Sequence, residues 1–161
     1  MDIGLLLNTE PIRGVGVLEP ICVEPQTPVA DVLRVMQENR RGSAFVCRNG
    51  RLVGIFTERD ALKLICPRAT AEQAAAAMAQ PIESVMTPDP ITLRGDESVK
   101  AAVARMSENG YRRLPIVDEN HRPVGLIDAA VIMRWLVELI PRTVYNLPPV
   151  PNPTTSEREG P

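Results

Sequence analysis

A short segment of the chain combines residue types that can bind a molecule carrying a sugar or a phosphate. The apolar residues Gly54, Ile55 and Phe56 lead directly to Thr57, and the carboxylate of Asp60 follows three residues later. Free backbone N–H groups and the positive end of a helix dipole favour an anion, and the Thr57 hydroxyl can add a contact to ribose or phosphate. An ionised carboxylate only accepts hydrogen bonds, so Asp60 suits the paired hydroxyl groups of a sugar.

The same spacing has a structural interpretation that needs no ligand. Thr57 is a favourable residue to precede a helix, and Asp60 stands where its side chain can accept a hydrogen bond from the Thr57 backbone N–H. Such a capping box more often uses Glu or Gln at the second position. The spacing alone leaves both interpretations open.

The other reactive side chains do not form a catalytic or metal-binding set. The single histidine, His121, lies in a polar turn, and the cysteines Cys22, Cys47 and Cys66 lack C-x-x-C spacing. Zinc sites usually draw on several Cys or His ligands, and a catalytic triad needs a nucleophile beside its histidine. We therefore expect no enzymatic activity, no metal, and reduced thiols in a cytoplasmic protein, with Cys22 and Cys47 buried.

The composition is that of an ordinary globular protein with an aliphatic core. The 161 residues are 44% hydrophobic and only 3% aromatic, and their formal net charge is −2. This length suits one compact domain or two small ones. The acidic balance argues against nucleic-acid binding, and no apolar run reaches the roughly 18 residues needed for membrane insertion.

The chain matches itself at an offset of about 70 residues, which indicates an internal duplication. Apolar residues recur with helical periodicity at equivalent positions after Pro28 and Ser98, and a Val-Gly pair recurs in equivalent apolar runs. Each copy is predicted to run strand, helix, strand, turn, strand, helix. The predicted strands are 20–23, 44–47 and 52–56 in the first copy, and 90–93, 114–117 and 123–127 in the second.

The duplication predicts an α+β fold in which two small units pack sheet to sheet, because about 50 residues cannot bury such a sheet alone. We expect the first repeat at 12–66, a connecting helix or linker at 67–81 and the second repeat at 82–140. The connecting helix is expected from the alanine-rich stretch 70–79. Residues 141–161 are rich in proline and are expected to be an extended or disordered tail.

Two tandem copies of this order, together with Leu-Pro-Ile-Val-Asp at 114–118 and the Thr57–Asp60 segment, resemble the paired cystathionine-β-synthase (CBS) domains of a Bateman module. The resemblance covers about residues 12–139. It implies two β-α-β-β-α repeats with pseudo-two-fold symmetry and a regulatory adenine nucleotide (AMP, ADP or ATP) in a cleft between them, with no required cofactor. S-adenosylmethionine and NAD(H) are further ligands of the family. Asp60 would then hold the ribose hydroxyls, and Thr57 would contact ribose or phosphate.

The resemblance also implies an opposing wall from the second repeat. Arg112 and Arg113 would bind phosphates, for which guanidinium groups are suited, and Tyr111 would line the adenine. Arg40, Arg41 and Arg59 are weaker phosphate candidates, and Glu97 stands where the family often has a hydroxyl. The predicted ligand-binding residues are Gly54, Ile55, Phe56, Thr57, Arg59, Asp60, Ala102, Tyr111, Arg112, Arg113 and Leu114.

The second copy departs from the pattern of the first. Asp128 stands at the position of Thr57, and Val131 replaces Asp60. Asp128 can still cap a helix, so the structural role survives without a ribose-binding carboxylate. We therefore expect one competent nucleotide cleft per chain, with the second empty or structural.

Two predicted helices, 60–65 and 128–140, are apolar around more than one face. Surplus apolar surface on a helix is typical of an interface, and the CBS resemblance implies a homodimer through such helices. The alternative is that the connecting helix and the tail cover this surface. Two functions follow: a stand-alone regulatory module that binds a nucleotide and signals to an unidentified target protein, or a dimerisation scaffold with vestigial clefts.

Overall fold

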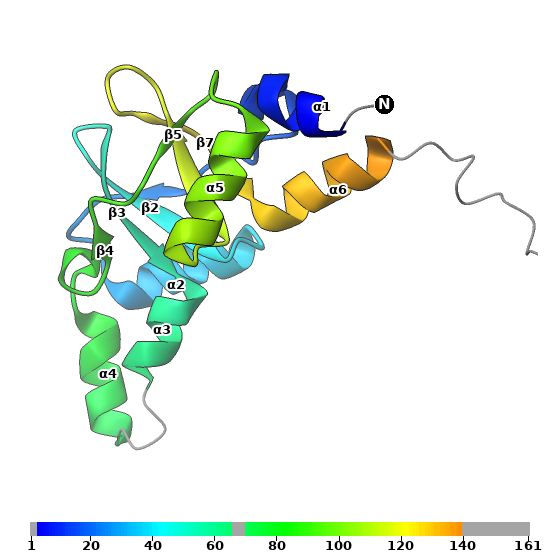
Figure 1. Cartoon of the computed structure of the whole chain (residues 1–161). Helices are drawn as coiled ribbons and strands as arrows, with labels where there is room; N and C mark the ends of the chain where they lie inside the picture. The colour runs from blue at the N-terminus through cyan, green and yellow to red at the C-terminus, as the bar shows by residue number, and fades with distance from the viewer. Residues whose placement is uncertain (1–2, 66–69, 140–161) are drawn as a thin grey trace, which may run out of the picture.

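The computed structural model describes residues 3–65 and 70–139, which form two small β-sheets with helices against their outer faces (Figure 1). The first sheet contains β1 (Cys22–Val23), β2 (Ser43–Arg48), β3 (Arg51–Thr57) and β4 (Thr87–Pro88), in that order. The second contains β5 (Leu93–Arg94), β6 (Arg113–Val117) and β7 (Pro123–Asp128). The helices are α1 (Ile3–Thr9), α2 (Val29–Glu38), α3 (Glu58–Leu64), α4 (Ala71–Ala79), α5 (Val99–Asn109) and α6 (Ala129–Leu139), with 3₁₀ turns η1 (Ile12–Gly14) and η2 (Ile82–Ser84).

The strand pairing follows from the connections between strands. β1 runs parallel to β2 and β5 runs parallel to β6, and each parallel pair is joined through a helix, α2 or α5. Parallel neighbours need such a crossover, whereas antiparallel neighbours can be joined by a tight turn. β2 and β3 form an antiparallel hairpin whose turn residues Asn49 and Gly50 both have positive φ, as a two-residue turn of this kind requires.

The predicted helical faces are confirmed. In α2 the residues Val29, Val32 and Met36 are buried, and in α5 the equivalent residues Val99, Ala102 and Met106 are buried. Pro28 precedes α2, and the Ser98 hydroxyl accepts a hydrogen bond from the Ala101 N–H at the start of α5. Each helix therefore buries its apolar stripe against the sheet of its own repeat.

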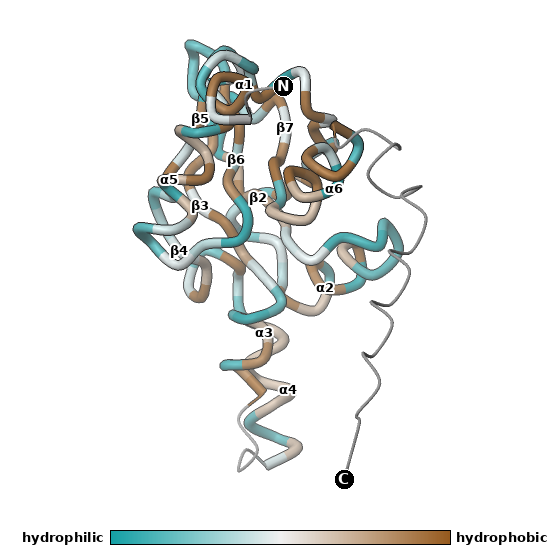
Figure 2. The backbone as a smooth tube through the Cα atoms, turned by 45° about the vertical axis from the view of Figure 1, so that its right-hand side comes forward, coloured by the Kyte–Doolittle hydropathy of each residue, from teal (hydrophilic) through white to brown (hydrophobic). Residues whose placement is uncertain are grey.

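The two sheets pack against each other through a cluster of apolar side chains, as predicted. Phe45, Cys47, Leu52 and Ile55 of the first sheet contact Val117 and Leu126 of the second. Figure 2 shows the hydrophobic stretches gathered in the strands of this central region, while most turns are hydrophilic. The predicted α+β fold with sheet-to-sheet packing is confirmed.

A pseudo-two-fold exchange links the repeats, and the sequence did not predict it. The Val29 N–H donates to the carbonyl of Gln80 at 3.0 Å, and the equivalent Val99 N–H donates to the carbonyl of Glu10 at 3.0 Å. Ile82 is fully buried in the core around α2, and Ile12 is fully buried in the core around α5. The segment at the start of each repeat thus completes the core of the other repeat.

The boundaries of several predicted elements differ from the observed ones. The first strand of each repeat is only two residues long, and both of these strands lie at sheet edges. α3 begins at Glu58 rather than residue 60, and α1 was not predicted. The alanine-rich stretch forms α4, which extends away from both sheets in Figures 1 and 2. The predicted tail and Cys66 lie outside the described residues.

The prediction that Cys22 is buried is wrong. Cys22 is exposed, because it lies on the edge strand β1, whereas Cys47 is buried on the neighbouring strand β2 as expected. Across residues 3–65 and 70–139, no helix combines the length and the apolar character that crossing a membrane would require.

Candidate ligand-binding cleft

Thr57 and Asp60 meet where β3 passes into α3. The Thr57 backbone N–H donates to Asp60 Oδ2 at 3.0 Å, and the Thr57 hydroxyl donates to the same oxygen at 2.7 Å. Asp60 Oδ2 therefore caps the start of the helix, as the structural interpretation of the spacing predicts. Asp60 Oδ1 lies 3.6 Å from Lys63 Nζ, and the Asp60 side chain is 13% exposed. One oxygen of the carboxylate positions the helix, and the other has no hydrogen bond to a described residue.

The start of α3 offers fewer free donors to an anion than the sequence suggests. The Glu58 N–H donates to the carbonyl of Gly42 at 3.1 Å. α3 is also only seven residues long, which limits the contribution of its dipole. Charged side chains, rather than the helix terminus, must therefore supply most of the attraction for an anion here.

A cavity of about 1060 Å³ lies between the repeats, next to Asp60. It joins the end of β3 and the start of α3 to the segment that enters β6 and to α6. Of the predicted binding residues, those that line it are Ile55, Thr57, Arg59, Asp60, Tyr111, Arg112, Arg113 and Leu114, and the weaker candidates Arg40 and Arg41 also line it. Segments about 50 residues apart in the sequence thus form one cleft, as expected.

Three predicted binding residues lie elsewhere. Phe56 and Ala102 are fully buried in the cores of the first and second repeat, respectively. Gly54 is buried beside Met86 and does not line the cavity. Ile55 lines the cavity whereas its neighbours Gly54 and Phe56 do not, because successive residues of a strand point to opposite faces of the sheet.

The cleft is strongly cationic although the whole chain is weakly acidic. Seven basic side chains and three carboxylates line it, for a formal charge of +4 against −2 for the chain. Among the described residues, five of the arginines have no ion-pair partner: Arg40, Arg41, Arg59, Arg112 and Arg134. Unpaired guanidinium groups along one cleft are suited to bind the oxygens of phosphate groups.

Arg113, a predicted phosphate ligand, already has protein partners. Its Nε lies 2.8 Å from Asp128 Oδ2, and its Nη1 donates to the carbonyl of Gly42 at 3.3 Å. Its Nη1 also lies 3.9 Å from Glu58 Oε2. The side chain comes so close to Gly42 that a Cβ there would lie 2.7 Å from Arg113 Nη2. Arg113 therefore links the two repeats on the wall of the cleft.

The second copy of the motif is built as a helix cap. Asp128 Oδ1 accepts a hydrogen bond from the Ala130 N–H at 2.8 Å, while its Oδ2 binds Arg113. Asp128 and Val131 line the same cavity as Asp60, so the two pseudo-equivalent half-sites share one continuous space. Only the first half-site presents a carboxylate oxygen without a hydrogen-bond partner in the described part of the chain.

Glu97 does not affect the cleft directly. It is absent from the lining, and its carboxylate binds Arg105 through two contacts of 2.5 and 3.0 Å. Burial alone would raise the pKa of Glu97, but the hydrogen bonds from Arg105 and from the Arg94 N–H outweigh burial and lower it. Glu97, which stands where the CBS resemblance implies a hydroxyl, is therefore held in an ion pair within its own repeat.

Several cleft residues were missed by the sequence analysis. Leu18 and Leu126 exchange two backbone hydrogen bonds of 2.9 Å and line the cavity together. Lys63 and Arg134 line it from α3 and α6. Lys63 lies three residues after Asp60 on one helix, so helical spacing was a usable signal for that residue. Leu18 had no such signal, because its position depends on a long-range contact.

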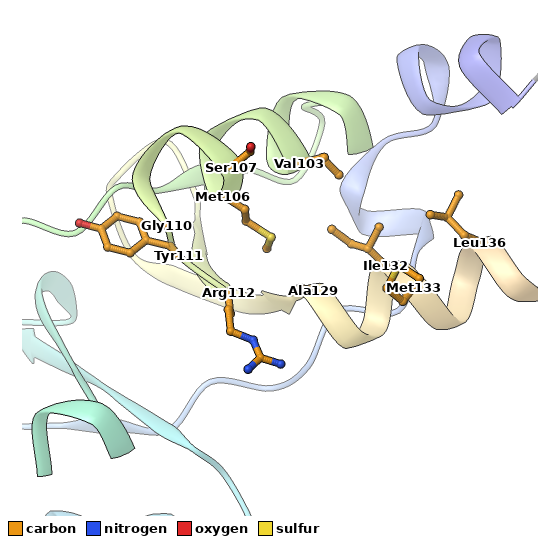
Figure 3. Close-up of a pocket in the computed structure, with 10 residues that line it drawn as sticks. All are labelled: Val103, Met106, Ser107, Gly110, Tyr111, Arg112, Ala129, Ile132, Met133 and Leu136. Carbon is orange, nitrogen blue, oxygen red and sulfur yellow. The ribbon is translucent and has the colours of Figure 1, made fainter. Parts of the chain in front are cut away.

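A second, smaller cavity of about 490 Å³ lies between α5 and α6. Figure 3 shows Met106 and Val103 of α5 and Ile132 and Leu136 of α6 around it. Arg112 lines this cavity at one end and also lines the larger cleft, and Tyr111 does the same. The described residues include no group of three or more Cys, His, Asp or Glu side chains placed to hold a metal ion.

Comparison with known proteins places these features in a family. A model of the CBS domain matches residues 13–67 and 82–138. A 17.7 kDa protein of Acidianus ambivalens is 31% identical over 118 residues, which cover 73% of this chain and 67% of that protein. A homoserine O-acetyltransferase of Methanococcoides burtonii is 38% identical over 91 residues, which cover 56% of this chain but only 17% of that protein.

Solved structures share the fold. Protein MJ1225 of Methanocaldococcus jannaschii, described as a putative archaeal homologue of γ-AMPK, has a TM-score of 0.71 and 28% identity, over 83% of this chain and 51% of that one. The CBS domain pair of protein MJ0100, in complex with 5′-methylthioadenosine and S-adenosyl-L-methionine, has a TM-score of 0.68 and 24% identity, over 81% and 98%. CBSX2 in complex with AMP has a TM-score of 0.67 and 22% identity, over 80% and 96%. With two matched repeats and the same fold, the chain belongs to the CBS domain family, as a tandem pair of the Bateman type.

Proposed function

We propose that the chain is a regulatory module that binds an adenine nucleotide in the cleft between its repeats. The observation that carries this proposal is the lining of one cavity by Asp60 and by five arginines without ion-pair partners in the described residues. A carboxylate that accepts from sugar hydroxyls and guanidinium groups that bind phosphate are the two contacts that a nucleotide needs.

Each part of a nucleotide has a partner in this arrangement. Asp60 Oδ1 is the oxygen left to accept from the ribose hydroxyls, since Oδ2 holds Thr57. Arg59 directly precedes Asp60, and Arg112 directly follows Tyr111. Both arginines are exposed and line the cavity, so they are the candidates to bind phosphate. Ile55 and Leu18 give the cavity an apolar part against which a base can pack.

The charge of the cleft favours one class of adenosine compound. The related structures of MJ0100 and CBSX2 hold 5′-methylthioadenosine with S-adenosyl-L-methionine, and AMP, respectively. A lining of formal charge +4 attracts the phosphates of AMP, ADP and ATP and repels the cationic sulfonium of S-adenosylmethionine. We therefore infer a preference for phosphorylated nucleotides.

The proposal is tested by the thermal stability of the protein with each ligand. A ligand at about 100 times its Kd should stabilise the fold by about 2.7 kcal/mol. We expect AMP, ADP or ATP to raise the Tm, and adenosine and S-adenosylmethionine to raise it less. No shift with any nucleotide at millimolar concentration would contradict the proposal.

Regulation requires that the nucleotide bind two packings of the repeats with different affinity. The Arg113 side chain can have two positions: bound to Asp128 and Gly42 on the cleft wall, or turned toward a phosphate in the cleft. A phosphate that attracts Arg113 would weaken this link between the repeats. A target protein that contacts both repeats would then sense the bound state.

The proposed module acts as a homodimer through its exposed apolar helix residues. Leu62 of α3 is 72% exposed and Met133 of α6 is 59% exposed, and Ile65 and Val137 are also exposed. Sedimentation velocity of the wild type and of Met133→Glu tests this point. We expect the wild type to sediment as a dimer and the variant as a monomer, and a monomeric wild type would contradict the proposal.

A non-catalytic scaffold is the second candidate function. Asp60 already holds Thr57, and Arg113 already holds Asp128, so both side chains have structural roles without a ligand. We expect no catalysis under either function, and the homoserine O-acetyltransferase relative contains the matched segment as a small part of its length. Dimerisation without any thermal response to nucleotides would favour the scaffold.

A further inference from the structure

Two thiols lie next to each other at the edge of the first sheet. Cys22 on β1 pairs in register with Phe45 on β2, and Cys47 follows Phe45 by two residues on the same strand. Phe45 and Cys47 both belong to the cluster between the sheets, so both point to the same face of β2. The register therefore makes Cys22 and Cys47 diagonal neighbours on adjacent strands, and both are free thiols.

The two thiols differ in exposure and in acidity. Cys22 is exposed on the edge strand, whereas Cys47 is only 5% exposed. The neighbouring Cys47 thiol, as a hydrogen-bond donor to the Cys22 thiolate, lowers the pKa of Cys22 to about 7 despite an opposing effect of burial. The same interaction, with burial and the nearby charge of Glu24, raises the pKa of Cys47. Cys22 is therefore the thiol that oxidants reach first and in its reactive thiolate form.

We propose that Cys22 and Cys47 are a redox-active pair that a peroxide converts to a reversible disulfide, with Cys22 as the attacking thiolate and Cys47 as the resolving thiol. This site is separate from the proposed nucleotide cleft, whose lining contains neither cysteine. The arrangement of one exposed and one adjacent thiol is what a reversible oxidation requires. Closing the bond requires β1 to move toward Cys47, and β1 is only two residues long and has a neighbouring strand on one side only.

The chemistry balances with hydrogen peroxide as the oxidant. The Cys22 thiolate attacks one peroxide oxygen, an S–O bond forms, the O–O bond breaks, and the released hydroxide takes a proton to become water. Cys47 then attacks the sulfur of the resulting sulfenic acid, an S–S bond forms, and the S–O bond breaks with loss of a second water. Two electrons pass from the two sulfurs to the peroxide. A dithiol reductant returns both cysteines to thiols by disulfide exchange.

Peptide mapping of the full chain tests the pair in a Cys66→Ser background, which removes the third thiol. Trypsin cleavage after Arg13, Arg34, Arg41 and Arg48 places Cys22 in peptide 14–34 and Cys47 in peptide 42–48. After treatment with hydrogen peroxide, we expect these two peptides to be joined by a disulfide that dithiothreitol removes. Cys22→Ser, at an exposed position, should lower the yield of oxidised Cys47 at least about tenfold.

A second variant identifies the first step. In Cys47→Ala, dimedone should label Cys22 as a sulfenic acid after peroxide treatment, because no resolving thiol remains. The proposal is overturned if the folded wild-type chain gives no joined peptides, if the disulfide forms only between two chains, or if Cys47 is oxidised as fast in Cys22→Ser as in the wild type. Circular dichroism verifies that each variant is folded.

Discussion

Arg113 donates a hydrogen bond to the carbonyl oxygen of Gly42 at 3.3 Å, and this bond ties a side chain of the second repeat to the backbone of the first. The Arg113 Nε is held at 2.8 Å from Asp128 Oδ2. These contacts lie on the wall of the cleft that contains Asp60. The relative position of the repeats is therefore coupled to the groups that an anionic ligand would approach.

Replacing Arg113 should destabilise the fold. Arg113→Gln loses a charged hydrogen bond to Asp128 and the bond to Gly42, and partly buried bonds to charged groups contribute about 1.5–3 kcal/mol. Arg94→Gln is the matched control, because Arg94 pairs with the exposed carboxylates Asp96 and Glu119 and should cost less than about 1 kcal/mol. Urea unfolding measures both, and equal losses would contradict the role of Arg113.

Gly42→Ala should disrupt the same link from the other side. A Cβ at residue 42 would lie 2.7 Å from Arg113 Nη2 and from Glu58 Oε2, so both flexible side chains must move. We expect a loss of about 1–3 kcal/mol in the free energy of unfolding. Gly95→Ala is the control, because its new Cβ would make only ordinary contacts of 3.9 Å. If Gly42→Ala were as stable as Gly95→Ala, the link between Arg113 and Gly42 would not contribute to the free energy of unfolding, which contradicts this prediction.

The Glu97–Arg105 pair predicts a pH dependence of stability. The pKa of Glu97 is lowered in the folded state, so its ionised form stabilises the fold above its unfolded pKa of about 4.3, and this contribution is lost as the pH falls through the folded pKa. Urea unfolding of Glu97→Gln should show a deficit relative to wild type at pH 7 that shrinks toward pH 3. Glu108→Gln, at an exposed position on α5, controls for the change in charge. An equal deficit at both pH values would contradict the assignment.

Local patterns predicted much of this structure. The helical spacing of Val29, Val32 and Met36 fixed which face of α2 is buried, because that face depends only on periodicity. The interval from Thr57 to Asp60 predicted the end of a strand and the helix cap correctly. Both signals lie within ten residues of sequence, where geometry follows directly from the chain.

Local sequence patterns did not predict the contacts between residues that are far apart in the chain. Arg113 and Gly42 are 71 residues apart, and no local signal shows that a backbone carbonyl will take the guanidinium. The exposure of Cys22 depends on the edge position of β1, which is a property of the assembled sheet. Ala102 was assigned to the cleft by analogy, but the stripe on its helix faces the core of its own repeat.

The most direct test of nucleotide binding is calorimetric titration of ATP and AMP into the wild type, Asp60→Asn and the control Asp31→Asn. Asparagine at residue 60 keeps an oxygen that accepts a hydrogen bond from Thr57 but removes the negative charge offered to the ribose hydroxyls. Asp31 is the control because it lies on α2, outside the cleft lining. We predict that Asp60→Asn weakens binding at least about tenfold, or about 1.4 kcal/mol, while Asp31→Asn binds as the wild type does. Equal affinity in all three proteins, or no binding to the wild type, would contradict a nucleotide site at Asp60.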